Sequence, residues 1–194
     1  MATPYLPDDQ WVLAYDEQIH AHARGFPILE LGCGRGRDTR HLLGMGEVVA
    51  LDLAFPRLIE CRHRAPMAVL VQADLSDGLP FPSATFGMVL ASLSIHYFTW
   101  QTTLAVLDEI RRVMAHKALL ILRVNSTRDQ NYGAVGYPQV EENLYAVGNE
   151  IKRFFDGPSL VELFKGWHIE TMAEREILRY EKQKWVWELS LYAA

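Results

Sequence analysis

The sequence predicts an α/β fold: a doubly wound, mostly parallel sheet of seven strands with helices on both faces. Three observations predict it. Short runs rich in valine, isoleucine and leucine alternate with segments of helical spacing, an order typical of parallel sheets. A glycine-rich turn directly follows the first such run. No internal repeat or linker-like composition divides the 194 residues, so we expect a single domain over residues 1–194.

Five apolar runs have the length and character of strands that are covered on both faces. They are Ile28–Leu31, Val48–Leu51, Ala68–Val71, Phe86–Ala91 and Leu119–Val124. Two closing strands, near His168–Glu174 and Val186–Tyr192, would complete the sheet.

Helical spacing connects these runs. The predicted helices are Asp8–Arg24, Arg37–Leu43, Ala54–Arg64, Gln101–Ala115 and a helix near Pro158–Phe164. In the fourth helix, an apolar stripe is formed by Leu104, Leu107, Ile110 and Met114. In the first, one face carries Trp11, Tyr15 and Ile19, which we expect to pack on the sheet edge.

The segment 125–156 has few periodic signals and several glycines. A connection of this length inside a compact domain is usually functional or contains structure of its own. We therefore predict a lid or an acceptor-binding insertion over residues 125–156.

Composition and charge exclude several classes of function. With 49% hydrophobic residues, the chain has enough apolar surface for a large core without disulfides. No apolar run approaches the roughly 18 residues that a membrane helix requires, so no membrane partner is expected. The formal net charge of -5 repels phosphate backbones, and the basic residues are scattered, so no nucleic acid partner is expected.

Residues 1–10 lack the basic start and apolar core of a secretory signal. We therefore expect a cytoplasmic protein, either a monomer or a homodimer. Cys33 and Cys61 have no metal-ligand spacing, which predicts reduced thiols and no metal site.

The glycine turn contains the most informative pattern. Gly32, Gly34 and Gly36 permit close approach of a ligand to the main chain. A dinucleotide fingerprint needs a small residue where Arg37 stands, so NAD is disfavoured. A phosphate-binding P-loop would need lysine and then serine or threonine after the last glycine, where the chain has Arg37 and Asp38.

Two acids accompany the turn: Glu30 lies two residues before it, and Asp52 lies at the end of the second strand. A carboxylate at that strand end can accept both hydroxyls of a ribose, which suits an adenosine group without a 2′-phosphate. With these residues the sequence resembles the class I S-adenosylmethionine-dependent methyltransferases, whose first motif reads acid-x-G-x-G-x-G. The likeness continues through the runs 48–52, 71–75 and 86–92.

This resemblance implies a Rossmann-like methyltransferase fold, S-adenosyl-L-methionine as cofactor and S-adenosyl-L-homocysteine as product. The implied cofactor-binding residues are Glu30, Gly32, Cys33, Gly34, Gly36, Asp52, Leu53, Asp74, Leu75 and Ser92. Asp52 would hold the ribose hydroxyls and Leu53 would pack on the adenine. Asp74 would recognise the adenine edge with Leu75, or would cap a loop instead. Glu30 would act near the amino group of the cofactor.

Two features of the resemblance are less typical. Residues 114–118 replace the Pro-Gly-Gly turn that many relatives have before the fifth strand. The chain is also loosely similar to the small bacterial methyltransferases grouped with the tellurite-resistance methyltransferase, which implies a small or inorganic acceptor.

Residues 92–100 follow the fourth strand, where an acceptor would enter. His96 is the candidate catalytic residue, because it can orient or deprotonate an acceptor; a packing role is the alternative. Tyr97 and Trp100 are candidates for binding the acceptor, or for building the core or the pocket wall.

Three later residues are further candidates for binding the acceptor: Arg123, Asn125 and Tyr132. Arg123 can pair with an anion on the acceptor. Alternatively, it forms an internal ion pair with one of three acids, Glu141, Glu142 or Asp129.

These observations favour an S-adenosylmethionine-dependent methyltransferase that transfers a methyl group to a small-molecule acceptor by in-line displacement. A protein or RNA methyltransferase is one alternative, which the net charge disfavours. A module that binds the cofactor without turnover is the other.

Overall fold

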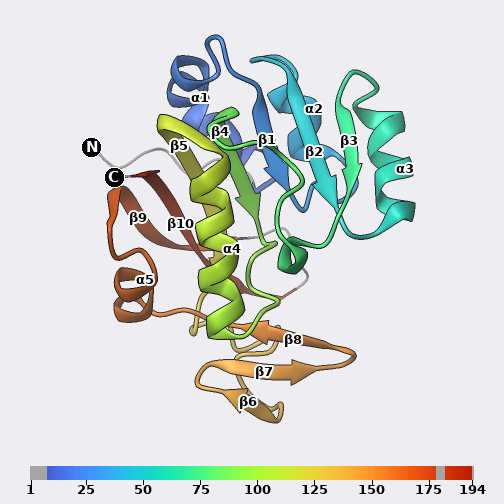
Figure 1. The fold of residues 1–194 in the computed structure, drawn as a ribbon. Helices are drawn as coiled ribbons and strands as arrows, with labels where there is room; N and C mark the ends of the chain where they lie inside the picture. The colour runs from blue at the N-terminus through green and yellow to red at the C-terminus, as the bar shows by residue number, and fades with distance from the viewer. Residues whose placement is uncertain (1–7, 178–181, 194) are drawn as a thin grey trace.

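The computed structural model describes residues 8–177 and 182–193 (Figure 1). It confirms the predicted α/β fold, with a seven-stranded sheet in the order β3-β2-β1-β4-β5-β10-β9. The strands are β1 (Ile28–Leu31), β2 (Val48–Asp52), β3 (Val69–Gln72), β4 (Phe86–Ser92), β5 (Met114–Asn125), β9 (Trp167–Ile177) and β10 (Lys184–Ala193). Strands β1 to β5 are parallel, and β10 is antiparallel to both β5 and β9. Residues 1–7 lie outside the described residues. They are part of the segment for which the sequence predicts no secretory signal.

Helices cover both faces of the sheet, as predicted. They are α1 (Asp16–His22), α2 (Arg37–Leu42), α3 (Phe55–Arg64), α4 (Trp100–Val113) and α5 (Gly157–Leu163), with 3-10 turns η1 (Asp8–Tyr15) and η2 (Leu75–Asp77). Among these described helices, none is both long enough and apolar enough to cross a membrane.

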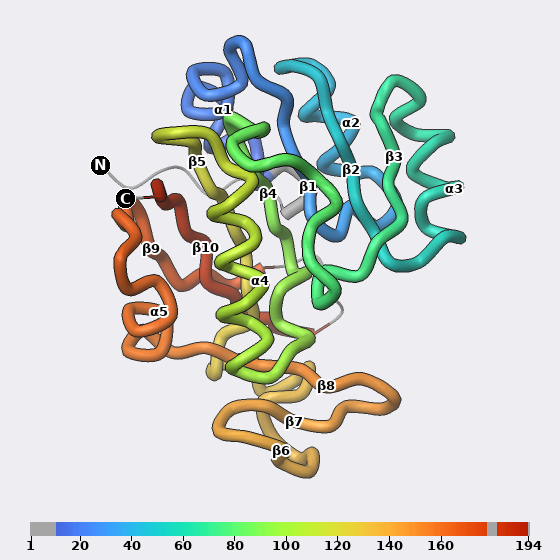
Figure 2. Tube along the Cα trace, viewed as in Figure 1, coloured from blue at the N-terminus to red at the C-terminus, as the bar shows by residue number. Residues whose placement is uncertain are grey.

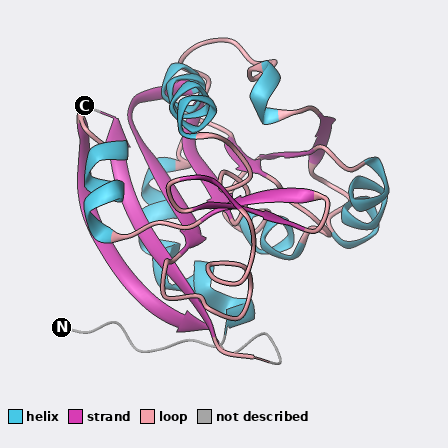
Figure 3. Ribbon diagram, turned by 90° about the horizontal axis from the view of Figure 1, so that it is seen from below, coloured by secondary structure: helices cyan, strands magenta, loops and turns pink. Residues whose placement is uncertain are grey.

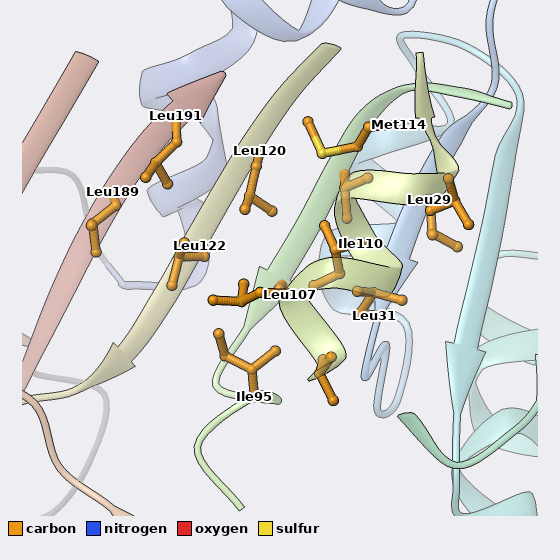
Figure 4. Packing of buried hydrophobic residues seen from close by; sticks show 14 of the residues in the cluster. Leu29, Leu31, Ile95, Leu107, Ile110, Met114, Leu120, Leu122, Leu189 and Leu191 are labelled. Carbon is orange, nitrogen blue, oxygen red and sulfur yellow. The ribbon is translucent and has the colours of Figure 1, made fainter. Parts of the chain in front are cut away.

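The core forms two layers because successive strand residues point to opposite faces of the sheet. On one face, Leu29 of β1 and Leu120 of β5 pack with Ile110 of α4 (Figure 4). On the other, Ile28 of β1 packs in a cluster with residues of α1, α2 and α3, including Ile19. Strand β1, which leads into the glycine turn, is thus packed on both of its faces, and this packing fixes the position of the turn.

The prediction for the fourth helix is wrong in two respects: the residue at which the helix ends and the residues that form its buried face. Helix α4 ends at Val113, because Met114 already pairs with Phe86 in the sheet. Leu104 is exposed, not buried as part of a stripe, and Thr103 lies in the buried face instead. The Thr103 hydroxyl donates to the Thr99 carbonyl at 2.8 Å, so burial leaves no unsatisfied polar group.

The first predicted helix is divided into η1 and α1, but its apolar face packs as expected. Trp11 and Ile19 are buried, and Tyr15 packs against the same cluster. The indole N–H of Trp11 also donates to Asp38, at 3.1 Å. This contact joins the N-terminal segment to α2, the helix that follows the glycine turn.

Residues 125–156 contain a small antiparallel sheet that was not predicted: β6 (Gln139–Glu141), β7 (Leu144–Val147) and β8 (Glu150–Arg153). Its strands are short and mostly half-exposed, so they have no apolar run to detect. The pair Gly148-Asn149 between β7 and β8 is a two-residue hairpin turn and was the available signal. Figures 2 and 3 show this sheet at the end of the main sheet toward which β1, β2 and β4 run.

A glycine of β4 allows the chain after α1 to lie against the sheet. A Cβ added at Gly87 would be 2.1 Å from the His22 carbonyl oxygen and 2.8 Å from Phe26 Cβ. We expect Gly87→Ala to lower the free energy of unfolding by about 1–3 kcal/mol, because backbone must shift. Urea unfolding followed by circular dichroism measures the change. Gly46→Ala is the control, since its Cβ would make ordinary contacts from 3.5 Å outward; equal losses in the two variants would contradict the prediction.

Candidate functional site

A cavity of about 440 Å³ lies beyond the carboxyl ends of β1, β4 and β5. This is the edge at which ligands of parallel α/β sheets bind. Nine of the predicted site residues line it: Glu30, Gly32, Cys33, Gly34, Ser92, His96, Tyr97, Asn125 and Tyr132. The remaining predicted residues lie outside its lining: Gly36, Asp52, Leu53, Asp74, Leu75, Trp100 and Arg123.

The three glycines of the turn have left-handed φ angles, for different reasons. A Cβ at Gly32 would lie 2.5 Å from Ser94 Cβ, and one at Gly36 would lie 2.6 Å from Cys61 Sγ. These two glycines are therefore required by packing within the protein. A Cβ at Gly34 would meet nothing within 4 Å. The main chain at Gly34 thus borders open space, which a bound group can occupy.

Asp52 holds the turn in place. Its Oδ2 accepts the Gly34 N–H and its Oδ1 accepts the Ala54 N–H, both at 2.8 Å. Asp52 is 6% exposed, so water competes little for these bonds. A carboxylate has about four acceptor positions, and each oxygen retains capacity for one further donor.

Glu30 is buried beneath the turn and accepts the Thr39 hydroxyl at 2.5 Å. Burial raises the pKa of Glu30 well above its usual range, and the nearby acids Asp38 and Asp52 raise it further. The Thr39 hydrogen bond opposes this shift. Glu30 therefore lines the cavity with a carboxyl group that tends to keep its proton.

The three residues predicted to contact adenine differ in burial and in hydrogen bonding. Asp74 Oδ1 accepts the Ser76 N–H at 2.8 Å and the Ser76 hydroxyl at 2.7 Å, which is the loop-capping arrangement. Leu75 is buried in the core, and Leu53 is 61% exposed.

His96 is buried and lines the cavity from the loop after β4. Its Nδ1 has no hydrogen-bond partner among the described residues. Burial lowers the pKa of His96 well below its usual range, and Lys184 and Lys152 lower it further. The imidazole is therefore neutral near pH 7, and its ring lies 4.2 Å from that of Tyr97.

Arg123 forms an internal ion pair, but with none of the three acids predicted. It pairs with Glu188 of β10, and its guanidinium lies 4.1 Å from the ring centre of Trp11. The antiparallel pairing of β5 with β10 places Arg123 opposite Glu188, and this long-range register was not readable from the sequence. Trp100 borders a second cavity, next to Arg153, which pairs with Glu141.

Asn125 and Tyr132 both lie next to Lys184, which was not among the predicted site residues. Lys184 Nζ donates to Asn125 Oδ1 and to Asp129 Oδ2, both at 2.9 Å, and lies 5.1 Å from the Tyr132 ring centre. Lys184 begins β10. An antiparallel strand begins where its parallel neighbours end, so strand direction would have revealed this residue.

Other missed residues come from the glycine turn, α2, α3 and the residue after β4. They are Arg35, Arg37, Asp38, Arg57, Arg64 and Leu93. The helical arginines are exposed and have the pattern of a solvated helix face, so no sequence pattern indicated a role for them. Lys152 of β8 also lines the cavity.

Residues 28–117 match a protein family described as a methyltransferase domain. This range contains the glycine turn, Asp52 and His96. The predicted resemblance is confirmed: this segment, somewhat less than half of the chain, is similar to the methyltransferase domain family, and the chain has the fold of solved S-adenosylmethionine-dependent methyltransferases. The narrower likeness to the tellurite-resistance group stays a prediction.

Two solved structures share the fold over nearly the whole chain. One is an S-adenosylmethionine-dependent methyltransferase from Methanosarcina mazei, with a TM-score of 0.78, 16% identity, and coverage of 91% of this chain and 96% of that one. The other is the 1,6-didemethyltoxoflavin-N1-methyltransferase of Burkholderia thailandensis, with bound 1,6-didemethyltoxoflavin and S-adenosylhomocysteine. It has a TM-score of 0.72, 20% identity, and coverage of 96% of this chain and 80% of that one.

Among curated proteins, the mitochondrial arginine-hydroxylase NDUFAF5 of Rattus norvegicus is 36% identical over 84 residues. The match covers 42% of this chain and 24% of that protein. The chain thus matches about a quarter of the length of this relative.

The raised pKa of Glu30 predicts how its replacement changes stability with pH. The folded protein holds the Glu30 proton to higher pH than the unfolded chain does. The contribution of Glu30 to stability is therefore present at low pH and is lost as pH rises above about 4.3. Glu30→Gln removes this loss, so we expect a larger free energy of unfolding than that of the wild type at pH 7, and a smaller difference at pH 4. Urea titrations at the two pH values measure it.

Glu109 provides a control of opposite sign, because its hydrogen bond with Arg112 lowers its pKa to about 2. The stability from Glu109 is present above about pH 4.3 and is lost as pH falls. Glu109→Gln should therefore destabilise the protein at pH 7. If Glu30→Gln also destabilised the protein at pH 7, the prediction would be wrong.

Proposed function

We propose that the protein is an S-adenosylmethionine-dependent methyltransferase that transfers a methyl group to a small-molecule acceptor. The observation that carries the proposal is the glycine turn. Gly34 borders open space and its N–H is held by the carboxylate of Asp52. A fixed main chain without side chains in the way suits close approach of a nucleoside.

The residues present fit the cofactor. Glu30, Gly32, Cys33 and Gly34 line one end of the cavity, where they would hold the methionine and ribose portions. Asp52 retains acceptor capacity for ribose hydroxyls after its two backbone bonds. Leu53, Asp74, Leu75, Gly36 and Ser92 complete the proposed cofactor-binding set. When bound, S-adenosylmethionine supplies an electrophilic methyl group on a sulfonium.

The chain itself must orient the acceptor, exclude water and, where the acceptor carries a proton, remove it. We assign proton removal to His96, because its imidazole is neutral and its Nδ1 is unpartnered among the described residues. Tyr97, Asn125 and Tyr132 would contact the acceptor from the cavity wall. Trp100 and Arg123 lie outside the lining and would support this wall instead.

Two observations support a small acceptor. The cavity of about 440 Å³, which the cofactor would share, is in the size range of small-molecule sites. The Burkholderia protein, which has a similar fold, is named for 1,6-didemethyltoxoflavin, and that compound is bound in its structure. We propose that residues 125–156, which contribute Asn125, Tyr132 and Lys152 to the cavity, form the acceptor-binding insertion.

A protein arginine is a second candidate acceptor, because NDUFAF5 is named as an arginine-hydroxylase. The charges of this site oppose it. Lys152 and Lys184 lie at the acceptor end of the cavity and would repel a guanidinium.

Titration calorimetry with S-adenosylmethionine tests the cofactor assignment. We expect wild-type protein to bind, and Asp52→Ala to weaken binding at least tenfold, because the turn loses its support and the ribose loses its acceptor. Asp108→Ala, on the exposed face of α4, is the matched control and should bind as the wild type does. Unchanged affinity in Asp52→Ala would contradict the assignment.

The role of His96 is tested by release of S-adenosylhomocysteine with an acceptor found in a metabolite panel. Lys152 of β8 and Lys184 of β10 face His96 and, with burial, lower its pKa. The neutral base is therefore retained as pH falls, and we expect activity to decline only clearly below the ordinary histidine value of about 6.5. His96→Asn should lower kcat about 10²-fold with unchanged affinity for the cofactor. A variant with full kcat would exclude proton removal by His96.

A further inference from the structure

The acceptor end of the cavity is built where the small sheet meets the loop after β4. The Arg153 N–H donates to the His96 carbonyl at 2.7 Å, and Asn125 Nδ2 donates to the Arg153 carbonyl at 3.5 Å. These bonds fix the end of β8 against His96 and Asn125. Lys152, the residue before Arg153, thereby lines the same cavity as His96.

The charges at this end do not balance within the cavity. Lys184 is matched by Asp129, which is fully buried beside it. The ion-pair partner of Lys152 is Glu150, at 3.6 Å, and that side chain is 57% exposed and outside the lining. The acids that line the cavity, Glu30 and Asp38, lie at the glycine-turn end. The Lys152 ammonium therefore gives the acceptor end an excess of positive charge.

His96 supplies an independent indication that a ligand belongs here. It is 3% exposed, and its Nδ1 has no partner among the described residues. A buried polar atom without a partner is unfavourable unless a ligand or water supplies the missing hydrogen bond. His96, with its unpartnered Nδ1, and Lys152 come from different elements and line the same cavity.

We infer that the acceptor carries a carboxylate, which pairs with Lys152 while the rest of the acceptor contacts His96. This inference rests on the proposed methyltransferase function and names its substrate class. A carboxylate suits one ammonium group, because both carry a single charge. A phosphate dianion would call for more donors than Lys152 provides, because Lys184 is already paired with Asp129 and the arginines of the lining come from the glycine turn, α2 and α3.

The cofactor makes this charge requirement stronger. A bound sulfonium would bring a further positive charge into a cavity that already holds Lys152 and Lys184. An anionic acceptor offsets the resulting repulsion, whereas a neutral one does not. Binding of the cofactor and of the acid should therefore be mutually favourable, and the neutral product S-adenosylhomocysteine should lack this coupling.

Matched probes test the inference in binding and in turnover. The acids benzoate, 4-hydroxybenzoate and succinate are each compared with the corresponding amide, and phenyl phosphate is a separate arm. Calorimetry measures the affinity for S-adenosylmethionine with each probe present, and release of S-adenosylhomocysteine measures turnover. We expect at least one acid to tighten cofactor binding fivefold or more, with no such effect from its amide or on S-adenosylhomocysteine.

Variants then identify the residue responsible. Lys152→Ala should abolish the coupling or raise the KM for the acid at least tenfold, and Lys152→Arg should restore most of it. Lys165→Ala, which replaces an exposed lysine just after α5, is the control. Thermal unfolding of each variant, with its affinity for S-adenosylmethionine alone, separates loss of fold from loss of acceptor binding.

The outcomes distinguish the two proposals. No binding of S-adenosylmethionine to the wild type overturns the methyltransferase function and the inference with it. Cofactor binding with equal responses to acids and amides, or with a preference for phenyl phosphate, overturns the carboxylate and leaves the function standing. An acid response that survives in Lys152→Ala overturns the assignment to Lys152.

Discussion

The carboxylate of Asp52 joins the two chain segments that shape the glycine turn. It accepts the N–H of Gly34 from the turn and the N–H of Ala54 from the start of α3. Hydrogen bonds to a charged group are roughly twice as strong as neutral ones, and burial keeps water from competing. The end of β2 thus fixes the turn after β1, and the cavity wall at Gly32 and Gly34 depends on it.

The part of the cavity around His96 is held in place by Arg153. Arg153 anchors the small sheet to the loop after β4 through its backbone N–H and through a guanidinium that donates to the Phe98 carbonyl at 3.2 Å and pairs with Glu141. The glycine turn is therefore supported by the main sheet, whereas the part of the cavity around His96 is supported by the small sheet within residues 125–156. Under the proposed function, such a division would allow the acceptor to change while the glycine turn stays the same.

Burial favours the neutral form of both Glu30 and His96, two titratable residues that line the cavity. It raises the pKa of Glu30 and lowers the pKa of His96, so each group is shifted toward its neutral form. The charges that remain are carried by side chains nearer to solvent or paired within the wall, such as Lys152 and Lys184. A bound ligand thus meets neutral deep groups and a positive rim.

The sequence by itself determined that β1 to β5 are strands and that a glycine turn follows β1, because these depend on local spacing: apolar runs that alternate with helical segments, and glycines at fixed distances along the chain. The tertiary structure decided the rest. The partner of Arg123 follows from the register of β5 with β10, and Lys184 enters the cavity because β10 runs antiparallel. The strands β6 to β8 bury too little apolar surface to leave a sequence pattern. Contacts between residues far apart in the chain are set by strand direction and register, which no local pattern encodes.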